Sequence, residues 1–283
     1  MALIDRLDEL AQLLNAALFL FLPLELWRRW GRGELSWASL REMLASASPL
    51  VLTIVFNAVV LGFIGVLFGV AAMLAPWQIP VTVPTMLVCL VAIDLLYYVD
   101  HRCGHRIRFL WAVSHSVHHS SPQFDQTTGL RISFIDGFLS PWFYLPAILI
   151  GFDPILVGAC MGVMLAYQQW LHTETIGRLG WFDWIFNSPS NHRVHHGVQD
   201  KYIDKNYGAM LMLWDRMFGT YQPEEEAPRY GLIKPIGSVN PIVVHCAEFI
   251  ALWRDLRGAP SWARRWALLW RPPGTAPLAS ERS

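Results

Sequence analysis

Hydrophobic residues gather in three long runs in the first third of the chain, at residues 10–26, 50–75 and 81–99. A helix that crosses a bilayer needs about 20 consecutive apolar residues. Each run therefore predicts a helix that spans, or nearly spans, a membrane. Pro76 and Pro80 lie between the second and third runs and indicate a tight turn, so these two runs predict a helical hairpin.

A second apolar block covers residues 138–150 and 155–170, and its two halves are separated by the turn signal Gly-Phe-Asp-Pro at 151–154. Each half is shorter than a comfortable span, which predicts a tilted or partly inserted hairpin. The chain is polar after His172. The tail at 249–270 mixes tryptophan with arginine, which is typical of an interfacial amphipathic segment; a helix that simply caps the fold is the alternative.

The pattern predicts an all-α integral membrane protein with about four to five transmembrane helices, formed by an N-terminal span and two hairpins. Its orientation follows from Arg28, Arg29 and Arg32, which come directly after the first run. The positive-inside rule places these arginines in the cytoplasm. Two hairpins then return the chain to the same side, so we expect a helical cap and its active site on the cytoplasmic face.

Composition strengthens the membrane interpretation. Of the 283 residues, 54% are hydrophobic and 16% are charged, whereas soluble domains are about one-quarter charged. The 14 tryptophans fit a membrane protein, because this residue is enriched at bilayer interfaces. The formal net charge is zero, so no basic surface for nucleic acid is expected.

Nine of the ten histidines fall between positions 101 and 196 in a regular pattern. The pattern consists of an HxxxH pair, a first HxxHH triplet, one isolated histidine and a second HxxHH triplet: His101, His105, His115, His118, His119, His172, His192, His195 and His196. Residues three and four apart are neighbours on a helix, so we expect each cluster to present its rings on one face. Neutral imidazole is a common metal ligand. Nine rings are too many for one ion, and they predict a site for two metal ions.

The donor set narrows the choice of metal. All-nitrogen ligation suits iron, zinc, copper or nickel. The sequence contains no HExxH and no ExxH pair, which disfavours a zinc-protease site and a carboxylate-bridged di-iron site. We therefore predict a histidine-rich centre of two iron ions, in which zinc can be a mismetallation product. Such a centre reduces O2 and oxidises an unactivated C–H bond, with a lipid chain delivered from the bilayer as substrate.

Several stretches resemble the membrane-bound fatty acid hydroxylase and sterol desaturase superfamily. They are DLLYYVDHRCGH at 94–105, LWAVSHSVHHSS at 110–121, QWLHTE at 169–174, NSPSNHRVHHG at 187–197, IDKNYG at 203–208 and LWDRMFGT at 213–220. The resemblance implies N-terminal transmembrane helices at 1–89, a catalytic domain at 90–240 and an amphipathic tail at 241–283. It also implies that the nine clustered histidines are the metal ligands.

Within this superfamily, the chain looks most similar to the alkylglycerol monooxygenases, which cleave ether lipids with tetrahydrobiopterin. Arg106 stands where that branch has a glutamate, and Asn191 stands where it has a further histidine. A general lipid hydroxylase or desaturase is therefore the main prediction and the pterin-dependent ether-lipid enzyme the alternative. We expect electrons from a separate ferredoxin- or cytochrome b5-like redox partner.

A third hypothesis is a metal-binding membrane protein without oxygen chemistry, such as a divalent-metal transporter or a zinc-stabilised scaffold. A transporter places its ligands near the bilayer midplane on broken helices. The histidine clusters here follow the predicted ends of the spans, which favours the oxygenase.

Polar residues near the histidines are candidates for supporting roles. Asp94 lies inside the third apolar run, where an acid is costly and usually functional. We predict that it orients a histidine or lines the substrate channel, with helix–helix contact as the alternative. Glu174 and Asn206 are predicted to hydrogen-bond ring N–H groups, and simple loop capping is the alternative. Arg131 and Lys205 are candidates to meet a lipid headgroup or the redox partner.

Overall fold

The computed structural model describes residues 2–274, and over that range its regular elements are all helical. Three segments are long and apolar enough to cross a membrane: α1 (Ala2–Gly31), the adjoining helices α2 (Trp37–Ala47) and α3 (Pro49–Leu74), and α4 (Val83–Arg106). The all-helical prediction is thus confirmed. The final residues of the predicted tail, 275–283, lie outside the described part of the chain.

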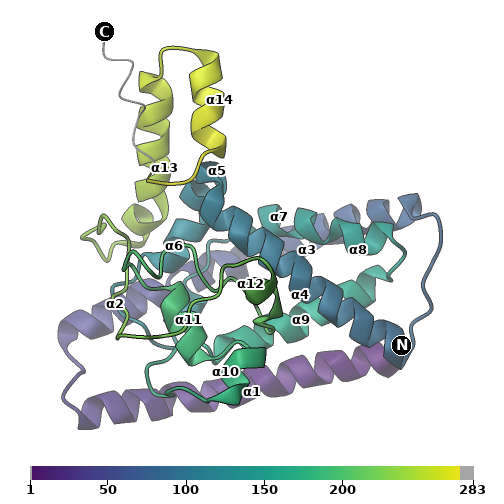
Figure 1. Ribbon diagram of the computed structural model, residues 1–283, viewed down its shortest axis with the longest axis horizontal. Helices are drawn as coiled ribbons and strands as arrows, with labels where there is room; N and C mark the ends of the chain where they lie inside the picture. Colours follow the sequence, from purple (N-terminus) through teal and green to yellow (C-terminus); the bar gives the residue numbers. More distant parts are fainter. Residues whose placement is uncertain (1, 275–283) are drawn as a thin grey trace.

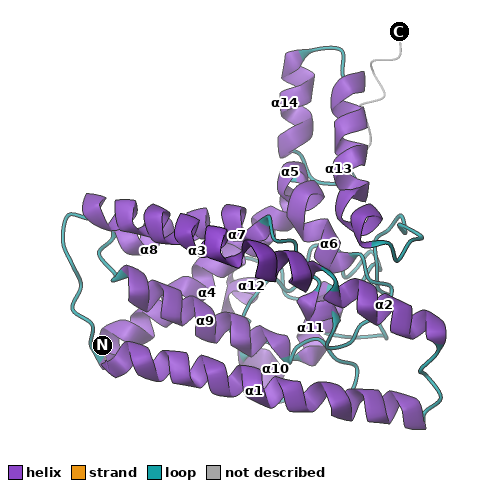
Figure 2. Ribbon diagram, turned by 180° about the vertical axis from the view of Figure 1, so that it is seen from behind, coloured by secondary structure: helices purple, strands orange, loops and turns teal. Residues whose placement is uncertain are grey.

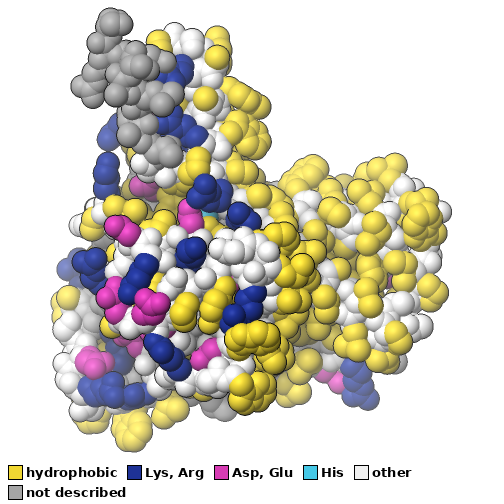
Figure 3. Space-filling model, in the orientation of Figure 1, with side chains coloured by type: hydrophobic (Ala, Val, Ile, Leu, Met, Phe, Trp, Pro, Cys, Tyr) yellow, Lys and Arg dark blue, Asp and Glu magenta, His cyan; other side chains and the backbone are white. Residues whose placement is uncertain are grey.

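The surface of the long helices suits a lipid environment. In the most apolar window of the segment Trp37–Leu74, none of the residues is buried inside the protein. Helix α4 begins at a capping box in which Thr82 and Thr85 satisfy each other's backbone N–H groups. Figure 3 shows hydrophobic side chains over the half of the molecule formed by these helices and charged side chains mainly over the other half. This division indicates which half lies in the bilayer.

The second predicted hairpin takes a different form. Its first half is broken into short elements, α7 (Asp136–Leu139), the 3₁₀-helix η3 (Ser140–Tyr144) and α8 (Leu145–Leu149). Its second half is α9 (Pro154–Gln169), whose 16 residues reach only about 24 Å at 1.5 Å per residue. Three helices qualify as spans in the described chain, fewer than the predicted four to five.

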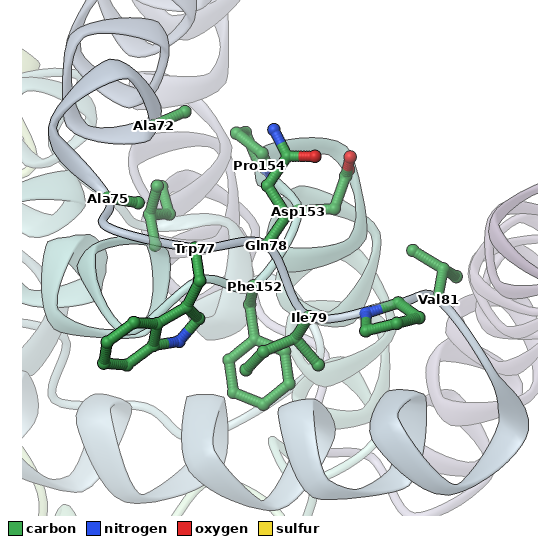
Figure 4. A pocket seen from close by; sticks show the side chains of 12 residues that line it. Ala72, Ala75, Trp77, Gln78, Ile79, Val81, Phe152, Asp153 and Pro154 are labelled. Atoms are coloured by element: carbon green, nitrogen blue, oxygen red, sulfur yellow. The ribbon is translucent and has the colours of Figure 1, made fainter.

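Helix α9 is apolar because it lies in the protein core. It packs against α1 and α4, and its buried residues include Leu156, Cys160 and Met164. At the α8–α9 turn, Gly151 adopts a positive φ of 106° and its carbonyl accepts a hydrogen bond from the backbone N–H of Ile79. A cavity of about 290 Å³ lies between this turn and the turn that joins α3 to α4. Figure 4 shows the side chains that line it, Trp77 among them.

The cap is built from short helices at the opposite end of the spans from this cavity (Figures 1 and 2). Its elements are α5 (Arg108–Leu110), the π-helix η1 (Trp111–His115), α6 (Ser116–His119), the 3₁₀-helix η2 (Thr128–Leu130), α10 (Trp181–Ile185), α11 (Pro189–His195) and α12 (Leu213–Met217). The last two described helices, α13 (Pro241–Gly258) and α14 (Trp262–Trp270), form a hairpin that projects from the cap.

Candidate metal centre

The nine clustered histidines converge into two groups that contain five and four rings. The first group is His101, His105, His115, His119 and His195, and the second is His118, His172, His192 and His196. Within each group, one nitrogen of every ring lies within 4.8 Å of those of the others. The groups adjoin, because the rings of His119 and His196 stack with centroids 4.3 Å apart. The arrangement fits two neighbouring metal ions.

Each HxxHH triplet contributes to both groups, contrary to the prediction that a triplet presents its rings together. His115 and His119 enter the first group, while His118 enters the second. The second triplet is divided in the opposite sense, with His195 in the first group and its two neighbours in the second. At about 100° per residue, positions four apart diverge by only about 40°, whereas the middle histidine points elsewhere.

The spacing of facing nitrogens fits metal coordination. Four pairs of Nε2 atoms approach closely: His105–His115 at 2.9 Å, His119–His195 at 3.1 Å, His118–His172 at 3.3 Å and His172–His192 at 2.9 Å. Two nitrogens bound about 2.0–2.1 Å from one ion, at the angles of octahedral or tetrahedral coordination, lie about 2.8–3.4 Å apart. The observed distances match this range.

Backbone contacts fix the tautomer of two rings. Nδ1 of His101 lies 2.8 Å from the carbonyl oxygen of Tyr207, and Nδ1 of His195 lies 3.0 Å from that of Lys205. A carbonyl only accepts, so both Nδ1 atoms carry the proton and both Nε2 atoms present a lone pair to the cluster. Nε2 of His101 is buried and has no hydrogen-bond partner within the described chain, as expected of a metal-binding atom.

The electrostatic environment keeps the rings in the neutral form that binds metal. Burial lowers the pKa of His172 to about 3. Burial, together with the neighbouring histidines, also holds the pKa values of His119 and His192 well below the usual range. A buried, uncharged imidazole keeps its lone pair at neutral pH, so these rings need no deprotonation before they bind an ion.

Close backbone packing supports both groups. Gly104 lies against the ring of His115, where an added Cβ would come within 3.3 Å. Gly129 lies against His172, where an added Cβ would come within 2.9 Å of Nδ1. His115 is the last residue of the π-helix η1, a distortion that is frequent at functional sites. At Gly129 a side chain would force a neighbouring group to shift, whereas at Gly104 the ring would have to yield by only a few tenths of an ångström.

Asp94 connects α4 to the cap. Its carboxylate accepts hydrogen bonds from the backbone N–H of Met210 at 2.8 Å and of Leu211 at 3.3 Å, and from the indole Nε1 of Trp214 at 2.7 Å. These hydrogen bonds go to the loop before α12 and to α12 itself, and none goes to a histidine ring of the described chain. The structure places Asp94 as a tie between a span and the cap.

Asn206 fastens two cap segments together. Its amide donates to the carbonyl oxygens of Asn191 and Gln222 at 3.0 and 2.8 Å, and its Oδ1 accepts from the backbone N–H of Gln222. Its φ is 56°, a left-handed conformation that asparagine tolerates. Asn191 is itself buried and donates to the carbonyls of Asp183 and Phe186. Neither asparagine is part of the two histidine groups.

Glu174 lies beside a cavity next to the second histidine group. This cavity of about 330 Å³ is lined by Arg28, Arg32, Glu34 and Glu174, with Phe124 and Tyr230 among its other residues. Tyr230 donates a hydrogen bond to Glu174 at 3.1 Å, and its ring stacks on Phe124 with centroids 4.8 Å apart. The ring of Phe124 is 5.0 Å from that of His196 and forms the wall between cavity and histidines.

Arg131 is buried, so the expectation that it meets a headgroup or a redox partner is wrong. Its guanidinium lies 2.5 Å from the carboxylate of Glu42 and also donates to Ser46. Both partners belong to α2, and the ion pair joins the cap to the start of the second span. The carbonyl oxygen of Lys205 accepts a hydrogen bond from Nδ1 of His195. The predicted surface role of the Lys205 side chain stays a prediction.

Sequence reasoning missed an ion pair that fixes α11. The guanidinium of Arg193 contacts both carboxylate oxygens of Glu224, at 2.8 and 2.7 Å, and Ser190 donates to the same carboxylate. Burial opposes the charged form of Glu224, but these hydrogen bonds and the charges of Arg193 and Arg178 outweigh it and lower its pKa. Arg193 sits inside the second triplet, and that position is the one signal by which it could have been found.

Comparison with known proteins agrees with the site. Residues 86–220 match the family model for fatty acid hydroxylase. The chain is 38% identical to alkylglycerol monooxygenase of Xenopus tropicalis and 36% identical to that of Homo sapiens, in each case over 71% of this chain and 44% of the relative. It is 33% identical to ornithine lipid hydroxylase OlsE of Rhizobium tropici, over 47% of this chain and 40% of the relative.

The chain thus spans less than half the length of the alkylglycerol monooxygenases it matches. No solved structure matches it.

Proposed function

Residues 86–220 belong to the fatty acid hydroxylase family, and from this premise we propose that the chain is an integral-membrane, non-haem di-iron oxygenase. It hydroxylates or desaturates a lipid chain or a sterol-like substrate with O2. The observation that carries the proposal is the convergence of nine histidines into two adjoining groups at one end of the membrane-spanning helices.

The donor chemistry suits iron as it also suits zinc, copper and nickel, because the two groups consist of nine neutral imidazoles. The choice of iron rests on the match to the fatty acid hydroxylase family. Two bound iron ions would supply the reduction of O2 and the oxidation of an unactivated C–H bond. The protein holds the rings in place, and seven of the nine histidines are buried away from water. A separate ferredoxin- or cytochrome b5-like donor supplies the electrons.

We propose that the active site faces the cytoplasm. Arg28 and Arg29, which follow the apolar part of α1, lie at the same end of the molecule as the cap. Arg28 donates to the carbonyl oxygen of Thr175, and Arg29 pairs with Asp125 at 2.6 Å. Basic residues flanking a span favour the cytoplasmic side, so the cap that they contact shares that side.

Polar neighbours of the site act as positioning residues in this proposal. Asp94 and Asn206 hold the loops whose carbonyls orient His101 and His195. Glu174 lies in the cavity behind Phe124, where it is placed to meet the polar end of a substrate or cofactor. In this proposal the lipid substrate enters from the bilayer, and the cap holds the histidine rings in position, as a lipid-modifying enzyme requires.

The second candidate is a pterin-dependent alkylglycerol monooxygenase, favoured by the names of the relatives at 34–38% identity. Arg106 replaces the glutamate of that branch, and its guanidinium lies 2.5 Å from the carboxylate of Asp204. Asp204 also lies 3.9 Å from Nδ1 of His105. Asp204 thus balances the positive charge of Arg106 beside the first histidine group. Because the added charge is neutralised, the exchange of glutamate for arginine is compatible with this candidate.

Comparative lipidomics tests both candidates. We expect cells that express the wild type to show an oxidised lipid that is absent with His118→Ala or His195→Ala, and purified protein to hold about two metal ions per chain. His245→Ala is the matched control, because His245 lies in α13 and outside both groups. Activity that requires added tetrahydrobiopterin would favour the ether-lipid enzyme. Identical lipid profiles for the wild type and both variants, with iron-loaded protein, would overturn the proposal for the lipids tested.

A further inference from the structure

The α13–α14 hairpin runs across the direction of the long helices. Figures 1 and 2 show the spans along the horizontal axis and the hairpin rising from the cap at a steep angle to them. The root of the hairpin is firmly attached, because α13 packs against η1 and α6 and α14 packs against α5. Arg108 in α5 also forms an ion pair with Asp255 in α13. If the spans cross a bilayer, the hairpin lies along its surface.

One side of the hairpin is strongly apolar and exposed. In α14, Trp262, Trp266 and Trp270 follow one another at intervals of four residues and are 81%, 64% and 53% exposed. In α13, Phe249 and Trp253 are also four residues apart and are 46% and 54% exposed. Residues at this spacing share one face of a helix. The hairpin therefore presents a stripe of aromatic rings that stay largely exposed, although Trp266 contacts Trp270 and Arg265 lies over Trp262.

This apolar side faces the bilayer half of the molecule. Figure 3 shows hydrophobic side chains along the edge of the hairpin that is turned toward the spans, and basic side chains on the opposite edge. The hydrophobic surface continues from the hairpin onto the spans. A membrane that covers the spans would therefore also meet the aromatic stripe.

The charge of the hairpin fits an anionic lipid surface. Residues 241–274 contain five arginines and two acids. Arg254 and Arg257 are exposed, and the guanidinium of Arg265 lies 4.8 Å from the centre of the Trp262 ring. Tryptophan and arginine together are typical of segments in the headgroup layer, where the rings enter the acyl boundary and the cations remain with the phosphates.

We propose that the α13–α14 hairpin lies in the headgroup layer of the same bilayer as the spans and binds anionic lipid there. The bilayer is favoured over a protein partner because the apolar stripe continues the lipid-facing surface and the opposite edge is basic. Since α13 packs on the helices that carry His115, His118 and His119, this contact fixes the position of the histidine groups relative to the membrane surface.

Site-directed spin labelling tests this proposal on the full chain. The background carries Cys103→Ser and Cys246→Ser, because these two cysteines are partly exposed, whereas Cys89 and Cys160 are buried. Single labels are placed by Trp266→Cys on the apolar stripe and by Arg254→Cys, an exposed position about 100° around α13 from Trp253, as the control. Both proteins are studied in nanodiscs of phosphatidylcholine with and without phosphatidylglycerol. Accessibility to O2, which concentrates in lipid, is compared with accessibility to a water-soluble nickel chelate.

We expect the ratio of O2 to nickel accessibility to be severalfold higher at position 266 than at position 254, and to rise further with phosphatidylglycerol. Equal ratios at the two positions would overturn the proposal. A label at 266 that is shielded from both reagents and shows spin–spin coupling would also overturn it, because a second copy of the chain would then cover the stripe. Metal-free protein suffices, so this result is independent of the proposed oxygenase activity.

Discussion

Substitution of Gly129 by alanine is expected to weaken the second metal position selectively. Gly129 lies in η2, and a Cβ at this position would sit 2.9 Å from Nδ1 of His172 and 3.0 Å from Oε1 of Gln169. Side-chain rotation cannot remove a Cβ, so the neighbouring ring has to move. His172 faces two other rings of its group, at 2.9 and 3.3 Å, and both contacts depend on its present position.

The size of the effect follows from the geometry. If the distance from the new Cβ to Nδ1 of His172 increases from 2.9 Å to an ordinary contact of about 3.5 Å, the imidazole is displaced by about 0.6 Å. Metal–ligand distances tolerate only about 0.2 Å, so the ring is lost as a good ligand. Disturbing the support of a ligand weakens metal binding by about 10- to 100-fold, which corresponds to about 1.4–2.7 kcal/mol.

The assay is metal content after competition with a graded series of chelators. The wild type should retain about two ions per chain at a chelator strength at which G129A retains about one. Gly158→Ala is the matched control, because a Cβ at Gly158 in α9 meets no atom within 4 Å. G129A that matches both the wild type and the control throughout the series would refute the assignment of His172 to a metal position.

Two further predictions concern the framework of the cap. Asp94→Asn places an amide against three N–H donors and should lower the stability of the cap by about 3 kcal/mol. Thermal unfolding in detergent measures this effect, with exposed Asp200→Asn as the control. Equal unfolding midpoints for the two variants would contradict this role of Asp94. The pKa of Glu224 is lowered in the folded state, so its stabilisation is present above the ordinary carboxylate pKa of about 4.3 and is lost as the pH falls. Between pH 7 and pH 4 the wild type should therefore lose more thermal stability than Glu224→Gln, and equal losses would argue against the ion pair with Arg193 as its source.

The nine histidines were identifiable from sequence because their spacing is local, but their division into two groups was not. Whether His118 joins His115 or His172 depends on how helices distant in sequence approach each other. Helical periodicity gives the angle between rings and not the identity of the ring they meet. The pattern thus predicted two ions, whereas the five-and-four partition required the tertiary structure.

The supporting residues were harder to interpret for the same reason. Asp94 lies two helical turns before His101, yet it contacts Met210, which is 116 positions away in sequence. Arg131 was expected at the surface, and its partner Glu42 is 89 positions away. A single charged residue shows that a partner is needed but not where that partner lies.

Hydropathy has a comparable limit. An apolar helix can face lipid or be enclosed by protein, and its composition is the same in both cases. Helix α9 was predicted to be half of a membrane hairpin, but it lies between α1 and α4 with much of its surface covered. Its length of 16 residues was the one feature of the sequence that argued against a membrane span.

The divided triplets make the two metal positions mutually dependent. One turn of helix holds ligands for both groups, so an ion that immobilises His115 and His119 also reduces the conformational freedom of His118. The second ion then meets a ring whose entropy has already been lost, and it binds more tightly than it would alone. By linkage the reverse holds to the same degree. In the wild type the two ions would therefore bind with positive cooperativity, each tightening the position of the other.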